Sequence, residues 1–181
     1  MKRKKLTASM IALVMSVSLP MTTYAANWYL EDGSVTVNAD NSGQTVTQGG
    51  TSTPDEAPVI TQRESSVETG NTIGISTSDN ATANVTIKDI NIKSGKDAID
   101  VTGSSSASIT LEGDNKIFSE TGSALHISDG NVTINGSGSL KAEIQDDPDS
   151  GYNHNAKIGS HENEDMSGSI HITGDATVKT D

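Results

Sequence analysis

A three-part unit of short segments, in which apolar and polar residues alternate, recurs along the chain and constrains its fold more than any other feature. The first part is a tetrapeptide with apolar second and fourth positions, and its leading apolar residues are Val85, Ile109, Val132 and Ile170. These residues lie 24, 23 and 38 positions apart. Alternation with period 2 indicates half-buried β-strands, and recurrence at a nearly constant interval indicates stacked repeats.

The other two parts follow in the same order each time. The second part is a pair of apolar residues after a corner rich in Gly, Asp and Asn, and the pairs are Ile90 and Ile92, Ile117 and Phe118, Leu140 and Ala142, and Ala176 and Val178. The third part begins with Ala, at 98–101, 124–127 and 156–158, so we align these segments on that Ala. Corners of this composition suit turns, because Gly and Asn tolerate positive φ and Ser and Asp bond their neighbouring backbone.

Sparse apolar content selects among the architectures that such strands can build. Only 32% of the residues are hydrophobic and the net charge is −12, a combination that ordinarily indicates disorder. Stacked short strands need few inward side chains, because each repeat extends the apolar row of its neighbour. We therefore predict an all-β chain that forms a right-handed parallel β-helix, or β-solenoid, with short strands and Gly/Asn/Asp/Ser corners. A β-sandwich of short strands is the alternative, since it also shows alternation and Gly-rich turns.

The first 25 residues differ in composition from the rest. A basic MKRKK start, an apolar stretch from Leu6 to Leu19 and small residues up to Ala25 predict a secretory signal peptide at 1–25. An uncleaved membrane anchor is the alternative. We expect a secreted, extracellular product that associates with the cell surface and has no membrane span once the signal is removed.

Residues 26–181 are expected to form a single domain. Its parts are an N-terminal region 26–70, regular coils 71–142, an acidic inserted loop 143–167 and last strands 168–181. The long 38-residue interval requires the inserted loop. Since the chain stops just after one strand, we expect a truncated C-terminus or a piece of a longer surface protein.

Charge and cysteine content exclude several functions. Without residues 1–25 the chain has 8 basic and 24 acidic residues, a net charge of −16. This charge argues against nucleic-acid binding, and it repels acidic substrates such as uronates. With no cysteine the chain has no disulfide, thiolate metal site or cysteine nucleophile.

Several stretches resemble a known group of proteins. The stretches are WYLEDGSVTVNADNSGQTVTQ (28–48), APVITQRESS (57–66), NTIGI (71–75), NATANVTIKDINIKSGKDAIDV (80–101), ITLEGDNKI (109–117) and AKIGSHENEDMSGSIHITGDATVKT (156–180). Together they resemble secreted parallel β-helix proteins of gut Firmicutes, many of which are described as carbohydrate-binding-domain-like or surface proteins. The resemblance implies the same β-helix architecture and a role at the cell surface. The charged KIGSHENED segment at 157–165 departs from the Gly-rich pattern of that group.

The acidic loop supplies the candidate metal ligands. Asp146, Asp147 and Asp149 lie close together in sequence and offer the oxygen ligands that Ca²⁺ prefers. A solvated acidic loop without metal is the alternative. Two histidines of the same loop, His154 and His161, lie near further carboxylates at 162, 164 and 165, so a zinc site is also open, with solvent-exposed histidines as the alternative.

Candidate sugar-binding residues are few because aromatic residues make up only 3% of the chain. The loop residues Tyr152, Asn153 and His154 are the predicted carbohydrate contacts. Trp28 and Tyr29 are better explained as an apolar cap over the first coil. Two strand histidines, at 126 and 171, alternate with apolar neighbours and are expected on outer faces of different walls.

Catalysis has weak support in the sequence. The carboxylates of Asp89 and Asp114, or of Asp97 and Asp100, could form a hydrolase pair, but Asp is common at corners for turn formation alone. We predict no catalytic residue and no obligatory cofactor. The predicted function is a non-enzymatic surface protein with a structural, adhesive or ligand-binding role, and its partners are glycans or cell-surface components. A carbohydrate-binding module, assisted by Ca²⁺ or not, is the first alternative, and a polysaccharide lyase or glycoside hydrolase is the second.

Overall fold

The computed structural model describes residues 25–145 and 155–180. The predicted signal peptide and the loop residues Asp146, Asp147, Asp149 and Tyr152, with Asn153 and His154, lie outside the described residues, apart from Ala25. Within the described part the chain is all-β, and its one helical element is the short 3₁₀ helix η1 (Leu30–Asp32). No helix there has the length and hydrophobicity that a membrane crossing requires.

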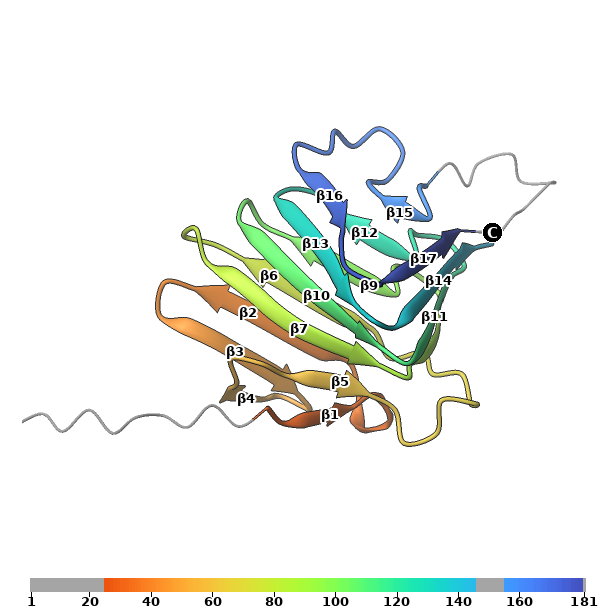
Figure 1. The fold of residues 1–181 in the computed structure, drawn as a ribbon, viewed down its shortest axis with the longest axis horizontal. Coiled ribbons are helices and arrows are strands. Elements are labelled where there is room, and N and C mark those ends of the chain that lie inside the picture. Colours follow the sequence, from red (N-terminus) through yellow and green to blue (C-terminus); the bar gives the residue numbers. More distant parts are fainter. Residues whose placement is uncertain (1–24, 146–154, 181) are drawn as a thin grey trace, which may run out of the picture.

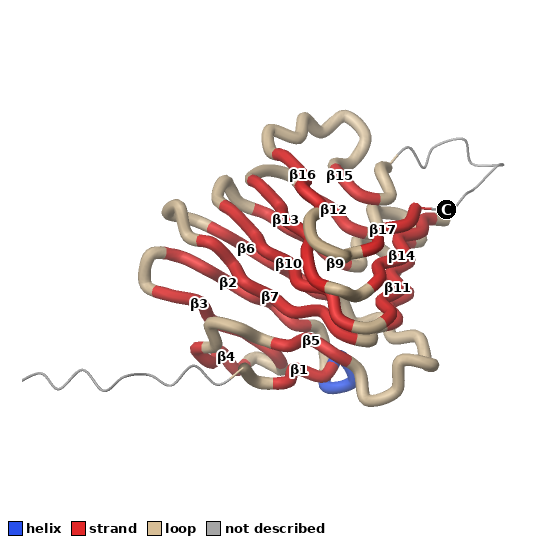
Figure 2. The backbone as a smooth tube through the Cα atoms, in the orientation of Figure 1, coloured by secondary structure: helices blue, strands red, loops and turns tan. Residues whose placement is uncertain are grey.

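The strands form three sheets (Figures 1 and 2). Sheet A contains, in spatial order, β1 (Asn27–Tyr29), β5 (Val59–Thr61), β7 (Thr82–Lys88), β10 (Ser106–Glu112), β13 (Asn131–Gly136) and β16 (Ser169–Ile172). Sheet B contains β15 (Ile158–Gly159), β12 (Leu125–Ile127), β9 (Ile99–Thr102), β6 (Ile73–Thr77), β2 (Val35–Asp40), β3 (Gly43–Gln48) and β4 (Thr51–Pro54). Sheet C contains β17 (Thr177–Thr180), β14 (Ser139–Ile144), β11 (Asp114–Ser119) and β8 (Asn91–Ser94).

From β7 onward the chain visits the sheets in the fixed order A, C, B. Strands β7, β8 and β9 form one such set, which we call a rung, and β10–β12 and β13–β15 form the next two. Strands of successive rungs pair in parallel in all three sheets. Antiparallel pairing within the described residues joins only β2 to β3 and β3 to β4. The expectation of an all-β chain with parallel sheets is therefore confirmed.

The observed register corrects two of the predicted alignments. Val85 pairs with Ile109 as expected, but Ile109 pairs with Ile134 and not with Val132. In sheet B, Leu125 pairs with Ile158, so the third segment is shifted by one residue from its alignment on Ala. A slip of two residues keeps the same side chains on the buried face, so alternation alone cannot detect it.

The core lies between the three sheets and consists of the inward side chains of every second strand residue. In sheet A, Val85, Ile109 and Ile134 are all buried and form one continuous row through direct register. In sheet C the buried residue of the second-part pair is Ile117, whereas Phe118 points to the outer face and is half-buried. Because neighbouring rungs share these rows, a thin core is sufficient.

Close approach between rungs depends on the corner residues. Gly136 has φ +103°, and a Cβ atom there would lie 2.3 Å from the carbonyl oxygen of Leu111. Asn115 is fully buried and bonds both neighbouring rungs: its Oδ1 accepts from the Ile90 amide at 3.3 Å and its Nδ2 donates to the Ser139 carbonyl at 3.0 Å.

The N-terminal end of the stack is closed differently. The buried Gln44 joins the antiparallel β3 to sheet A, since its Nε2 donates to the carbonyl of Asn84 and its Oε1 accepts from the amide of the same residue. Trp28 packs against the edge of the core, where its Nε1 donates to Asp55 at 2.9 Å. Tyr29 lies under the guanidinium of Arg63, 4.1 Å from its ring centroid.

Candidate functional site

Three lysines form a row across the outer face of sheet C. Lys116 of β11 pairs directly with Lys141 of β14, which pairs directly with Lys179 of β17. Each lysine alternates with inward residues, so the pleat directs all three side chains outward. Strands lie about 4.8 Å apart, and like charges directly opposite one another destabilise a sheet. Glu143 offsets part of this repulsion, because it pairs with Lys141 at 3.0 Å.

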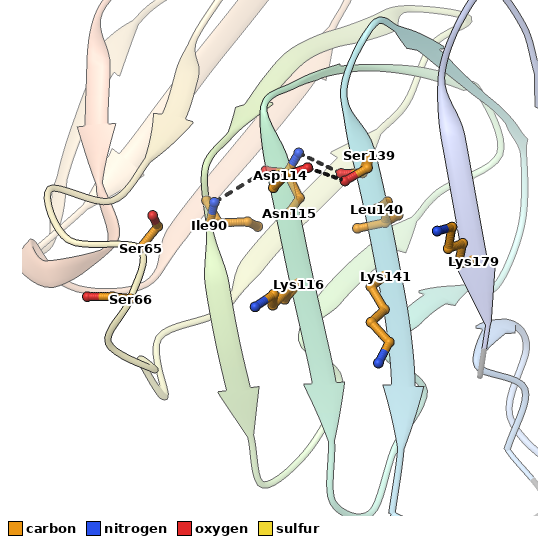
Figure 3. A pocket seen from close by; sticks show the side chains of 10 residues that line it. All are labelled: Ser65, Ser66, Ile90, Asp114, Asn115, Lys116, Ser139, Leu140, Lys141 and Lys179. Atoms are coloured by element: carbon orange, nitrogen blue, oxygen red, sulfur yellow. Dashed lines mark hydrogen bonds between the residues drawn. The ribbon is translucent and has the colours of Figure 1, made fainter.

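A groove of about 420 Å³ lies along this row. Figure 3 shows the lysines on three adjacent strands, with Ser65 and Ser66 of the loop between β5 and β6 to one side. The groove is lined by these two serines together with Ile90, Asp114, Asn115, Lys116, Ser139, Leu140, Lys141 and Lys179. Ammonium groups and hydroxyls thus share one open surface, whereas Ile90, Asn115 and Leu140 at its floor are buried.

The charge of sheet C is opposite in sign to that of the whole chain. Its four strands carry four lysines and only two carboxylates, Asp114 and Glu143. Glu143 pairs with Lys141 at 3.0 Å, and Asp114 accepts a hydrogen bond from Ser139 at 2.8 Å. The three lysines are 25 and 38 positions apart in sequence, and only strand register shows that they share a face.

A second, smaller groove of about 200 Å³ adjoins the first and shares Lys116. It contains Phe118, the single phenylalanine of the chain, on the same outer face. The ammonium of Lys93 lies 5.6 Å from the Phe118 ring centroid. The sequence pattern pairs Phe118 with Ile117 as a second apolar strand residue and does not indicate that its ring lies on the outer face, beside the lysine row.

A separate cluster of histidines and carboxylates lies on sheet B. His126 of β12 and Asp100 of β9 are direct register partners, and His126 Nδ1 lies 2.7 Å from Asp100 Oδ1. Its other ring nitrogen, Nε2, lies 2.8 Å from Glu164 Oε2. The ring of His161 stacks on that of His126 with centroids 4.0 Å apart, and its Nε2 lies 2.7 Å from Asp97 Oδ1.

These contacts shift the proton affinity of the cluster. Burial by itself would lower the pKa of His126, but its hydrogen bonds with Asp100 and Glu164 outweigh burial and raise that pKa above its ordinary value of 6.5. The hydrogen bond from His126 is also the main cause of a lowered pKa for Glu164.

The structure brings together only part of the predicted zinc set. His161 and Glu164 join the cluster, whereas Glu162 and Asp165 are exposed and His154 lies outside the described residues. His126 is only 6% exposed although its strand position directs it away from the core, because the segment that carries His161 packs over it.

The other predicted residues have simpler surroundings. His171 is exposed on β16 of sheet A. Of the two carboxylate pairs considered for catalysis, Asp89 accepts a hydrogen bond from the Asp114 amide at 3.1 Å, the turn role expected of a corner Asp. The second pair, Asp97 and Asp100, belongs to the histidine cluster.

Comparison of the chain with protein-family models, with curated proteins and with solved structures returned no match.

Proposed function

We propose that the chain is a secreted, non-enzymatic β-solenoid that binds acidic carbohydrate polymers along the outer face of sheet C. The solenoid part of this proposal is supported by the repeated A, C, B order of strands and by parallel pairing between successive rungs. Parallel pairing in all three sheets also argues against a β-sandwich, whose sheets are antiparallel.

The row of Lys116, Lys141 and Lys179 is the single observation that carries the binding proposal. After residue 25 the chain has only eight basic residues, and three of them stand side by side on one sheet face. A ligand with evenly spaced negative charges would contact all three lysines at once and reduce the repulsion that remains between them beside the Lys141–Glu143 pair.

The shape of the face favours an extended ligand. The lysines run across the strands rather than around a closed cavity, and the two grooves adjoin at Lys116. Phe118 offers an apolar ring face for a sugar, while Ser65 and Ser66 offer hydroxyls for hydrogen bonds. An acidic polysaccharide combines these features, since it has regular charges, ring faces and many hydroxyls.

The net charge of −16 expected without residues 1–25 does not prevent such binding but restricts where it occurs. Acidic polymers are repelled by most of the surface and attracted by sheet C, so the field of the protein orients the ligand. Because attraction between exposed charges is screened by salt, binding should weaken as ionic strength rises.

The test is a binding panel that compares polygalacturonate, alginate and hyaluronan with the neutral polymers dextran and xylan. We expect saturable binding to at least one acidic polymer and none to the neutral ones. The triple variant Lys116→Ala, Lys141→Ala and Lys179→Ala should lose at least tenfold in affinity. Lys88→Ala is the matched control, because Lys88 lies on sheet A and pairs with Glu112 at 3.2 Å.

Two outcomes would overturn the proposal. One is the absence of binding to every acidic polymer at low salt, which would leave a structural role. The other is equal binding by the triple variant and the wild type. Release of unsaturated or reducing sugar ends during the same incubations would instead support the lyase or hydrolase alternative.

A further inference from the structure

Each of the two stacked imidazoles of sheet B lies between carboxylates. His126 has Asp100 at one ring nitrogen and Glu164 at the other, at 2.7 and 2.8 Å. His161 has Asp97 at 2.7 Å from Nε2 and Glu164 at 3.7 Å from Nδ1. Three carboxylates therefore surround the two rings.

The hydrogen-bond pattern of His126 requires a further proton or a metal ion. An ionised carboxylate only accepts hydrogen bonds, and a neutral imidazole carries a hydrogen on one nitrogen alone. If Nδ1 donates to Asp100, then Nε2 presents a lone pair to the Glu164 carboxylate. A second proton, on Nε2 or on Glu164, or a metal ion at Nε2 removes this conflict.

The geometry suits a metal ion. One ligand atom from each of Asp97, His126 and His161 lies within 4.8 Å of the others. Glu164 Oε2 lies 2.8 Å from Nε2 of His126 and 3.7 Å from Nδ1 of His161, beside this group rather than within it. Ligand atoms at 2.0–2.1 Å around tetrahedral zinc are about 3.3 Å apart. The two rings are stacked 4.0 Å apart with an interplanar angle of 11°, so their lone pairs do not meet at one point, and the half-exposed ring of His161 has to turn for both rings to bind one ion.

The surroundings also meet the demands of such a site. Asp100 on Nδ1 of His126 corresponds to the carboxylate that commonly orients a metal-bound histidine. His126 is nearly buried and sits on a strand within the sheet, so its ring position is held by the fold. Imidazole with carboxylate suits zinc and neighbouring transition metals, whereas Ca²⁺ and Mg²⁺ prefer oxygen ligands alone.

We infer that Asp97, His126 and His161 form a site for one Zn²⁺ or similar divalent transition-metal ion, with Glu164 beside it. The ion joins β12 to the segment after β15 and thereby fastens the last described rungs together. The site lies on sheet B and is independent of the lysine row on sheet C.

The inference is tested by calorimetric titration of the untagged, metal-free chain with ZnCl₂, alongside NMR of its four histidine rings. We expect one Zn²⁺ per chain, shifts confined to two of the four rings, and no competition from millimolar Ca²⁺ or Mg²⁺. Cobalt in place of zinc should give the intense visible absorption of a four-coordinate ion.

Variants assign the ligands. His161→Ala removes a half-exposed ring, and Asp97→Asn keeps an oxygen that can accept from the Ser123 amide, so both should fold. Each should weaken zinc binding at least tenfold. His171→Ala, in the exposed histidine of sheet A, and His154→Ala should leave it unchanged.

Three results would overturn the inference of a zinc site. No zinc binding by the wild type, or binding that persists at full strength in both His161→Ala and Asp97→Asn, overturns the inference. Loss of binding in His154→Ala alone would also overturn it, because it would move the ligands away from sheet B. Circular dichroism of each variant separates loss of the site from loss of the fold, and the cobalt spectrum of the wild type decides the case if a variant does not fold.

Discussion

Replacing the buried Asn115 by alanine is expected to destabilise the stack without creating a large apolar cavity. The Asn115 side chain accepts from the Ile90 amide and donates to the carbonyls of Glu112 and Ser139. It therefore joins its own corner to the rung before and to the rung after. Its exposed fraction is 0%, so water does not reach these groups in the folded protein.

The magnitude follows from the three bonds. A typical hydrogen bond contributes about 1 kcal/mol net, and a buried partner left without one costs about 1–3 kcal/mol. Loss of the Asn115 side chain should therefore lower the free energy of unfolding by about 3 kcal/mol. Domains commonly have only about 5–15 kcal/mol in total, so the change is large.

The assay is urea unfolding, followed by far-ultraviolet circular dichroism and by the fluorescence of Trp28, the single tryptophan. Circular dichroism reports all rungs, whereas Trp28 reports the N-terminal end. Asn84→Ala is the matched control, because the Asn84 side chain is exposed and makes one hydrogen bond to its own strand. We expect the control to change stability by less than about 0.5 kcal/mol.

The reasoning is refuted if Asn115→Ala and Asn84→Ala lose the same stability. Coincident midpoints from the two probes are required for the comparison, since long repeat arrays can unfold in parts. If the probes separate, the circular dichroism transition should carry the larger loss, because Asn115 lies far along the chain from Trp28.

Two further predictions follow from single positions. Gly136→Ala should destabilise the protein by at least about 2 kcal/mol in the same urea assay, because Gly136 has φ +103° and its new Cβ would lie 2.3 Å from the Leu111 carbonyl oxygen. Gly33→Ala should cost less, because no atom lies within 4 Å of its Cβ. Equal losses of stability in the two variants would contradict this. The hydrogen bond from Arg63 lowers the pKa of Asp32 from its ordinary value of 3.8, so its stabilisation is present at neutral pH and is lost as pH falls through the lowered pKa. Arg63→Gln should raise that pKa toward 3.8 in an NMR titration of the carboxyl group, and an unchanged value would count against the pair.

Strand identity was accessible from sequence because it depends on local alternation. The pattern around Val85, Ile109 and Ile134 predicts strands with one buried face, and all three residues are buried. Strand register could be predicted only in part from the sequence. The pairing of Ile109 with Ile134 differs from the sequence alignment by two residues, and both registers bury the same face.

The candidate sites differ even more than the strands in what the sequence could predict. The sequence placed the candidate metal ligands and sugar contacts in the loop at 143–167, because its charged and polar residues are neighbours in sequence. The lysine row combines residues about 25 and 38 positions apart, and the histidine cluster joins Asp97 to His161 across 64 positions. The local pattern indicated His161 and Glu164 of the histidine cluster, but not Asp97 or His126 and not the lysine row, because those groupings depend on which residues of successive rungs become partners.

The amino-acid sequence alone therefore determined that the chain is all-β, that each short strand pairs with the corresponding strand of the next repeat, and that few apolar residues are enough for its core. Alternation and turn composition act over a handful of residues, so they can be read along the chain. Only the tertiary structure decided which lysines share a face and which carboxylates surround His126. These groupings come from strand register and from a segment that folds back over sheet B, and both are set by packing between residues distant in sequence.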